Sequence, residues 1–226
     1  MFLKDLLFPK LCLSCGYLGA YICCSCQKKL NKIKKDSCLY CEKASINGYS
    51  HPNCLKKNGV AGFVGVFNYD NRLKKIIKEI KYRRVKEALT ELIALIDFGS
   101  IKKLKNFLSG FFLIQPIPLH LSKEKERGFN QAGLIANYLA KDLNVSLVQG
   151  LIRKRPTKTQ AQLSKKKDRL KNINGAFCAT NKRTIKGKNI LLVDDVLTTG
   201  STIKEAARTL KKAGANKIYA FTLAKG

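Results

Sequence analysis

The sequence contains little negative charge, no tryptophan and no long hydrophobic run. It carries 44 Lys and Arg against 15 Asp and Glu over 226 residues, a formal net charge of +29. No segment approaches the roughly 18 uncharged apolar residues that a membrane-spanning helix requires. Residues 1–9 include Lys4 and Asp5 and lack the small-residue cleavage site of an export signal. The low counts of 5 Pro and 16 Gly, and the absence of a sustained heptad, exclude collagen-like and coiled-coil chains. We therefore expect a globular protein without a membrane span, located in the cytoplasm.

The positive charge indicates an anionic partner. Lys and Arg that neutralise phosphates release counterions, so a nucleic-acid complex of such a protein should be salt-sensitive. An ordinary lysine-rich surface explains the charge equally well. Aromatic platforms are few, with 8 Tyr and 11 Phe, most of the Phe in apolar strands. Binding to a single strand would therefore depend on electrostatics more than on base stacking.

The distribution of cysteine divides the chain. Eight of the nine cysteines lie between Cys12 and Cys54, and the later sequence contains only Cys178. Residues before position 60 show no long apolar periodicity, so that segment needs a covalent or metal staple. We predict a cysteine-rich module at residues 1–60 and a second domain at residues 61–226.

The cysteine spacing predicts structural zinc. Four pairs of metal-ligating residues share a two-residue spacing: Cys12 and Cys15, Cys23 and Cys26, Cys38 and Cys41, and His51 and Cys54. This spacing is typical of tetrahedral zinc sites, whereas a disulfide framework belongs to oxidising compartments. Our preferred assignment joins Cys12, Cys15, Cys38 and Cys41 in one site and Cys23, Cys26, His51 and Cys54 in another. Sequential pairing, or Cys24 in place of Cys23, is the alternative.

After residue 60 the hydrophobic pattern alternates between the periods of strands and helices. We predict strands at residues 62–69, 111–114, 145–152, 190–193 and 217–223, and helices around residues 73–80, 87–96, 134–139 and 203–213. Pro116 and Pro118 argue against a helix or a central strand immediately after residue 114. Residues 153–171, rich in Lys and Arg, are expected to form an exposed loop. The alternation predicts an α/β fold with a parallel sheet and flanking helices.

A phosphate-binding loop follows the strand at residues 190–193. Two carboxylates, Asp194 and Asp195, precede a turn with a glycine and several hydroxyls, which leads into a helix. Such a turn offers backbone N–H groups to a phosphate. The carboxylates can bind sugar hydroxyls or hydrated Mg²⁺, so a 5-phosphorylated ribose suits both halves. The phosphate-binding candidates are Thr198, Thr199, Gly200, Ser201 and Thr202.

The chain resembles the ComF family of competence-associated proteins. The loop at residues 194–202 resembles the type I phosphoribosyltransferase signature. The match extends to residues 116–120, 127–132, 160–164 and 175–177, behind the cysteine-rich module. The resemblance implies a type I phosphoribosyltransferase fold joined to a zinc finger, and a role in handling single-stranded DNA during natural transformation. It also implies that Asp194 and Asp195 contact ribose and metal, and that the ligand is phosphoribosyl pyrophosphate or a similar sugar phosphate with Mg²⁺.

Further residues are candidates for contacts with pyrophosphate or DNA. They are Pro118 and His120 in the loop that corresponds to the pyrophosphate-binding region, together with Arg127, Lys154 and Arg169. Asn174 replaces a basic residue that relatives tend to carry before Gly175. The pattern leaves open whether the protein is a catalytically active phosphoribosyltransferase with an unknown acceptor. It also leaves open whether the cysteine module docks DNA-translocating competence proteins.

Overall fold

A five-stranded parallel sheet forms the centre of the molecule. The structure, a computed structural model, describes residues 9–55, 59–107, 110, 112–156 and 171–226. The sheet has the strand order β1-β7-β6-β2-β3, and β4 and β5 form a separate antiparallel pair. The strands are β1 (Gly62–Asn68), β2 (Phe112–Pro116), β3 (Ser146–Leu147), β4 (Leu151–Arg153), β5 (Phe177–Ala179), β6 (Asn189–Leu197) and β7 (Ile218–Lys225). The α/β class predicted from the sequence is confirmed.

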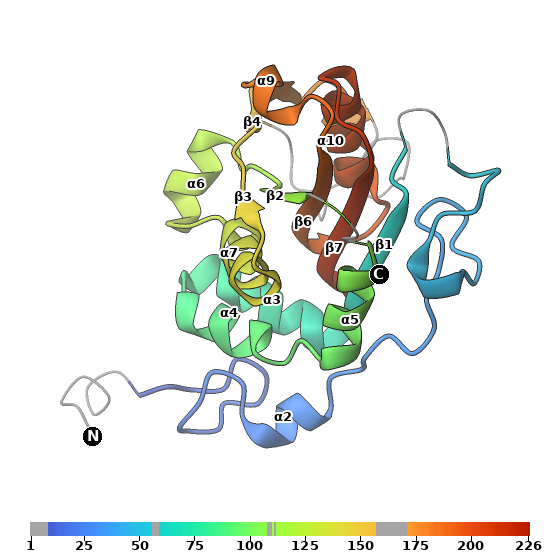
Figure 1. Cartoon of the computed structure of the whole chain (residues 1–226). Helices are drawn as coiled ribbons and strands as arrows, with labels where there is room; N and C mark the ends of the chain where they lie inside the picture. The colour runs from blue at the N-terminus through green and yellow to red at the C-terminus, as the bar shows by residue number, and fades with distance from the viewer. Residues whose placement is uncertain (1–8, 56–58, 108–109, 111, 157–170) are drawn as a thin grey trace.

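Helices cover both faces of this sheet (Figure 1). They are α2 (Cys24–Lys28), α3 (Asn71–Arg83), α4 (Lys86–Ile93), α5 (Phe98–Phe107), α6 (Leu121–Arg127), α7 (Gln131–Leu143), α9 (Lys182–Ile185) and α10 (Ser201–Lys212), with a 3-10 turn η1 (Ile46–Gly48). In the described ranges, no helix combines the length and apolar character needed to cross a bilayer.

Strand β6 separates two hydrophobic cores. It is hydrogen-bonded to a parallel neighbour on each side, and its residues Ile190 to Val193 are fully buried. Leu191 and Val193 face the core that contains α3, α4, α5 and α7, whereas Ile190 and Leu192 face the core that contains α10. A continuous apolar run is expected in a parallel strand that helices cover on both faces.

The predicted helix stripe after β1 is confirmed in α3. Asp70 caps this helix by accepting a hydrogen bond from the Leu73 N–H at 2.9 Å. The stripe residues Leu73, Ile76, Ile77 and Ile80 are buried against the sheet. The stripe therefore fixes the orientation of the helix on its sheet face.

Several predicted boundaries differ from the structure. Helices α2, α5, α6 and α9 and strand β5 were not predicted, and the predicted strand at residues 145–152 is two strands, β3 and β4. Pro116 ends β2 and pairs with Val193, so the argument against a strand there was wrong. The ladder tolerates Pro116 because the next residue, Ile117, donates its N–H to the Val193 carbonyl at 2.8 Å. Most of the predicted basic loop, residues 157–170, lies outside the described residues.

The cysteine-rich segment lies against the sheet domain at two places (Figure 1). Its first half packs on α3 and α4, where the Glu91 carboxylate accepts a hydrogen bond from the Ile22 N–H at 2.8 Å. Its second half lies beside β1, where the Ser50 N–H donates to the Ala61 carbonyl at 2.9 Å. Ile22 is fully buried in the first of the two cores. Both halves therefore share in the packing of the sheet domain.

Candidate functional site

The two acidic residues lie within the last part of β6. The strand extends beyond the predicted residues 190–193 and ends at Leu197, so Asp194 and Asp195 are strand residues. The Asp195 N–H donates to Oδ1 of Asp194 at 2.9 Å. Lys81, from α3, places its Nζ 2.5 Å from Oδ2 of Asp195. The acidic pair is therefore held at the carboxyl end of the sheet by α3 as well as by β6.

Burial and charge give the two carboxyl groups different proton affinities. Burial, followed by the negative charge of Asp195, raises the pKa of Asp194 to about 7. Burial also acts to raise the pKa of Asp195, but Lys81 and then Arg127 outweigh it, so this pKa lies below its ordinary value. Near neutral pH, Asp195 is ionised and Asp194 exchanges a proton. The pair can thus accept hydrogen bonds from hydroxyls or ligate a hydrated cation.

The loop after β6 has the form of an anion-binding turn. Gly200 has a positive φ of 70° and precedes α10 as its N-cap. The Thr199 and Ser201 hydroxyls are 2.6 Å apart. Within the described part of the chain, the backbone N–H groups of Thr199 and Gly200 donate to no protein acceptor. With Thr198 and Thr202 flanking them at the positive end of α10, these groups suit a phosphate.

Basic side chains from two further elements, α6 and β4, lie near the acidic pair. Arg127 ends α6, and its charge lowers the pKa of Asp195. Lys123 lies on the same helix, and burial, followed by Arg127 and Arg153, lowers its pKa. Arg153, in β4, lies 5.6 Å from the Phe177 ring centre and interacts electrostatically with Asp194. These cations form a rim that can bind a polyanionic group beside the carboxylates.

The sequence reasoning missed Lys81 and Lys123. A signal for Lys81 existed, since it lies four residues after Ile77 and borders the buried stripe of α3. Lys123 lies in a helix that was not predicted. Neither residue belongs to a recognisable motif. The ion pair of Lys81 with Asp195, and the position of Lys123 near Arg127 and Arg153, follow from the packing of α3 and α6.

The predicted pyrophosphate-loop residues lie at the same edge. Pro118 and His120 follow β2, which is the parallel neighbour of β6. Nδ1 of His120 lies 2.8 Å from the Ser122 hydroxyl and accepts from the Ser122 N–H at 3.3 Å, so His120 caps α6. Lys154 is exposed and donates its backbone N–H to the Ala176 carbonyl at 2.9 Å. Arg169 lies outside the described residues.

Arg208 brings a guanidinium to the position of Asn174. It donates to Oδ1 of Asn174 at 2.9 Å and to Oε1 of Glu205 at 2.7 Å. The same Glu205 oxygen accepts from the Gly175 N–H at 2.8 Å. An adjoining cavity of about 340 Å³ extends from Asn174 to Ser201 in the phosphate loop. The basic group missing at residue 174 is thus present nearby, partly neutralised by Glu205.

The first metal-ligand group consists of Cys12, Cys15, Cys23 and Cys26, whose ligand atoms lie within 4.8 Å of one another. Sγ of Cys15 and Sγ of Cys23 are 3.6 Å apart, close to the ~3.8 Å expected across a tetrahedral zinc site with Zn–S bonds of about 2.3 Å. Burial raises the pKa of Cys12, but backbone N–H donors of Cys23, Cys15 and Ser14 lower it to about 6. These four residues fit a structural zinc ion.

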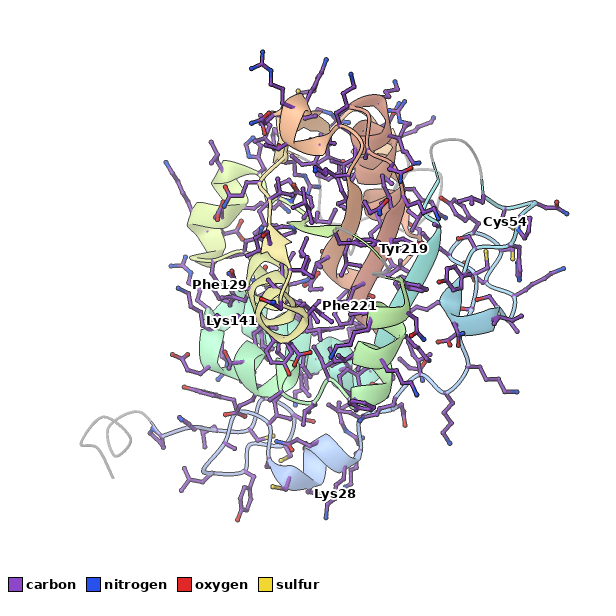
Figure 2. All side chains as sticks on the ribbon, viewed as in Figure 1. Lys28, Cys54, Phe129, Lys141, Tyr219 and Phe221 are labelled. Atoms are coloured by element: carbon purple, nitrogen blue, oxygen red, sulfur yellow. The ribbon has the colours of Figure 1, made fainter. Side chains whose placement is uncertain are left out.

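The second group consists of Cys38, Cys41, His51 and Cys54, also within 4.8 Å of one another. Nδ1 of His51 lies 3.3 Å from Sγ of Cys41, and Nε2 lies 3.0 Å from the Ala44 carbonyl. A proton on Nε2 that donates to this carbonyl leaves Nδ1 available as a ligand. Figure 2 shows sulfur atoms gathered beside Cys54 in this group. It too can hold structural zinc.

The preferred pairing of the metal ligands was therefore wrong. The structure joins Cys12 and Cys15 with Cys23 and Cys26, and it joins Cys38 and Cys41 with His51 and Cys54. Sequential pairing results because the first half packs on α3 and α4 while the second lies beside β1. Cys24 is exposed and takes no part in either group.

The second cysteine group contacts the phosphate loop. Leu39 Cδ1 lies 3.6 Å from the point at which a Cβ on Gly200 would stand. Lys204, on α10, places its Nζ 5.1 Å from the centre of the Tyr40 ring and donates to the Thr199 carbonyl at 3.4 Å. The turn between Cys38 and Cys41 therefore packs against the outer side of this loop.

Comparison with known proteins agrees with this architecture. The family model described as "Phosphoribosyl transferase domain" matches residues 125–226. "Competence protein F" of Haemophilus influenzae is 30% identical over 214 residues, covering 90% of each chain. "Competence protein ComFC" of Bacillus subtilis is 29% identical and covers 89% of this chain and 83% of its own. "DNA utilization protein YhgH" of Escherichia coli is 29% identical over 95% of this chain and 96% of its own.

The pairing of the metal ligands can be tested by zinc content. Replacing Cys12 and Cys15 together with Ser should remove one zinc ion, whereas replacing Cys12 and Cys38 together should remove both, because the two lie in different groups. Native mass spectrometry measures the number of ions. Cys24→Ser, at an exposed position, is the control and should retain both. If the variant at Cys12 and Cys38 loses a single ion, the two residues share one site, and the pairing of Cys12 and Cys15 with Cys38 and Cys41 is correct after all.

The raised pKa of Asp194 predicts a pH-dependent stability. With an unfolded pKa of about 3.9 and a folded pKa of about 7, the native state binds more protons than the unfolded state between these values. The free energy of unfolding then falls as pH rises through this range. Asp194→Asn should therefore gain stability relative to wild type between pH 5 and 8, by on the order of 2 to 3 kcal/mol.

Denaturant unfolding at both pH values measures this difference. Because the pKa of Asp195 is lowered, this carboxyl titrates at more acidic pH and stays ionised between pH 5 and pH 8. Asp142→Asn, on the exposed side of α7, is the matched control. An Asp194→Asn effect of equal size at pH 5 and pH 8 would show that the carboxyl does not titrate there.

Proposed function

Because this chain belongs to the ComF family of competence proteins, we propose that it handles single-stranded DNA in the cytoplasm during natural transformation. In this proposal its phosphoribosyltransferase-like domain binds phosphoribosyl pyrophosphate or a similar sugar phosphate. The names of the relatives, which refer to competence and DNA utilization, support the first part. The second part is supported by the backbone N–H groups of Thr199 and Gly200, which follow Asp194 and Asp195 and donate to no acceptor among the described residues.

The site combines the groups that a phosphorylated ribose requires. The 5-phosphate would accept hydrogen bonds from the amides of Thr199 and Gly200 and from the hydroxyls of Thr198, Ser201 and Thr202. Asp194 and Asp195, in the preceding strand, would accept hydrogen bonds from the ribose hydroxyls. Both contacts arise from one strand-loop-helix unit, so a single ligand can reach them.

The cationic rim suits the pyrophosphate of such a ligand. Lys123, Arg127 and Arg153 interact electrostatically with one another or with the acidic pair. When bound with the ligand, Mg²⁺ would neutralise phosphate charge, with Asp194 and Asp195 as its outer contacts. Lys81 would hold Asp195 ionised and in place.

The same rim favours a second function, a catalytically active phosphoribosyltransferase with an unknown acceptor. Transfer from phosphoribosyl pyrophosphate breaks the bond between the anomeric carbon and pyrophosphate and forms a bond from that carbon to the acceptor. Cations at the leaving group would stabilise the charge that develops on it. The acceptor is then the component that experiments must identify.

DNA handling is supported by charge and by the metal-ligand groups. A net charge of +29 gives a strong attraction for phosphodiesters. The cysteine groups hold short segments on the surface of the domain, where DNA-translocating competence proteins can dock. Binding of a sugar phosphate at its site would then regulate DNA handling at this surface.

Calorimetry with phosphoribosyl pyrophosphate and Mg²⁺ tests the sugar-phosphate site. The variant Asp194→Asn with Asp195→Asn should bind at least about tenfold more weakly, because it loses two charged acceptors for the ribose and metal; tenfold corresponds to about 1.4 kcal/mol. Asp142→Asn is the control and should bind as wild type does. Equal binding by all three proteins would contradict the proposal.

The same samples separate binding from turnover. Release of pyrophosphate over a panel of acceptors, lost in the double Asp variant, would favour the enzyme. Binding without release would favour a phosphate-binding scaffold.

Binding to fluorescent single-stranded DNA across a salt series tests the DNA-handling role. We expect the logarithm of the affinity to fall linearly with the logarithm of salt concentration, with a slope of about −0.7 for each phosphate neutralised. Fluorescence anisotropy measures the affinity. Absent binding, or an affinity that salt does not change, would reject this role.

A further inference from the structure

A pocket with aromatic and basic walls lies at the amino-terminal edge of the sheet. It has a volume of about 440 Å³ and lies between the second cysteine group and the starts of β1 and β7, with a lining that includes Tyr49, Leu55, Ala61, Lys211, Lys217 and Tyr219. Figure 2 shows Tyr219 on the side of the sheet toward the segment that carries Cys54. Neither the metal ligands nor the sugar-phosphate site uses this pocket.

Its aromatic wall is built on a buried stack. The Phe107 and Tyr219 rings are stacked with centroids 4.7 Å apart, and Tyr49 meets Phe107 edge to face at 4.8 Å. Tyr219 is buried, whereas Tyr49 is 38% exposed and Leu55 is 44% exposed. The exposed ring of Tyr49 is therefore held in place by the core behind it, which lowers the entropy lost when another ring stacks on it.

The charged residues that line the pocket are both lysines, Lys211 and Lys217. Every lining residue comes from residues 43–69 or 206–226, and neither segment contains an Asp or a Glu. Lys211 and Lys217 lie at the end of α10 and just before β7, and the Lys211 ammonium donates to the carbonyl of Asn216, the residue before Lys217. A flat apolar ring beside ammonium groups, with no carboxylate in either segment, suits a ligand that joins an aromatic base to a phosphate.

We propose that this pocket binds an unstacked base of single-stranded DNA, with Tyr49 against the base and Lys211 and Lys217 against the adjoining phosphates. The inference rests on the DNA-handling part of the proposed function and assigns it a surface. A duplex would keep its bases stacked and paired, so the pocket would select the single strand.

This surface is separate from the sugar-phosphate site. Ile218 and Tyr219 at the pocket begin β7, whereas Asp194 pairs with Thr222, four residues after Ile218. At ~3.3 Å per residue this separates the two positions by about 13 Å along the strands, and the phosphate loop lies further on. Both ligands can therefore be bound at the same time.

The test compares the affinity of a fluorescein-labelled oligothymidylate for a set of full-length variants. Tyr49→Ala should weaken binding roughly tenfold, and Tyr49→Phe, which keeps the ring, should restore it. Lys217→Glu should weaken binding and reduce the salt slope by about one phosphate contact. Lys141→Glu is the matched charge control: Lys141 is exposed on α7 (Figure 2), and its variant should stay closer to wild type.

The outcomes separate this inference from the proposed function. If wild type binds the oligothymidylate, and Tyr49→Ala and Lys217→Glu bind it as tightly as Lys141→Glu does, the pocket inference is overturned and the DNA-handling role is not. Absence of wild-type binding would overturn the DNA-handling role and the pocket together. Equal competition by duplex DNA would also exclude a base pocket. Binding of phosphoribosyl pyrophosphate with Mg²⁺ should be unchanged in Tyr49→Ala, which shows that the variant is folded.

Discussion

The partial burial of two adjacent carboxylates at the end of the central strand is the constraint that organises this protein. Asp194 and Asp195 follow four fully buried residues of β6 and are themselves only partly exposed, so water compensates their charges incompletely. Lys81 neutralises Asp195, and Asp194 takes up a proton near neutral pH. The ion pair consequently ties α3 to β6 across the sheet edge. The phosphate loop follows β6 directly after this ion pair, so the contacts that stabilise the fold also position the site.

The two cysteine groups explain how the cysteine-rich segment is held on the surface of the sheet domain. Segments without helical or strand periodicity cannot hold themselves on a domain surface by apolar burial alone. Four ligands within 4.8 Å of one another give each half of the segment a centre around which its turns close. One half then covers α3 and α4, and the other places Leu39 and Tyr40 against the phosphate loop. Structural metal at the second group would thus support the loop from outside.

Much of the fold was predictable because periodicity is local. The stripe Leu73, Ile76, Ile77 and Ile80 identified α3, and the apolar run before Asp194 identified the central strand. Helix α6 was missed because it buries none of its residues and therefore leaves no apolar stripe in the sequence. Pro116 was misjudged because a proline that ends a strand costs a single ladder bond, and Ile117 resumes the ladder.

The sequence by itself determined the α/β class, the glycine- and hydroxyl-containing loop at residues 198–202 and the eight Cys and His residues that could hold metal, because each is a pattern of residues close together in the chain. The tertiary structure decided which of these residues form a common group, because four pairs of identical spacing can combine in several ways and the packing on α4 or beside β1 selects one combination. It also brought Lys81 and Arg127 to the acidic pair and set Tyr49 beside Lys217. These juxtapositions join residues far apart in the chain, and only the folded sheet brings them together.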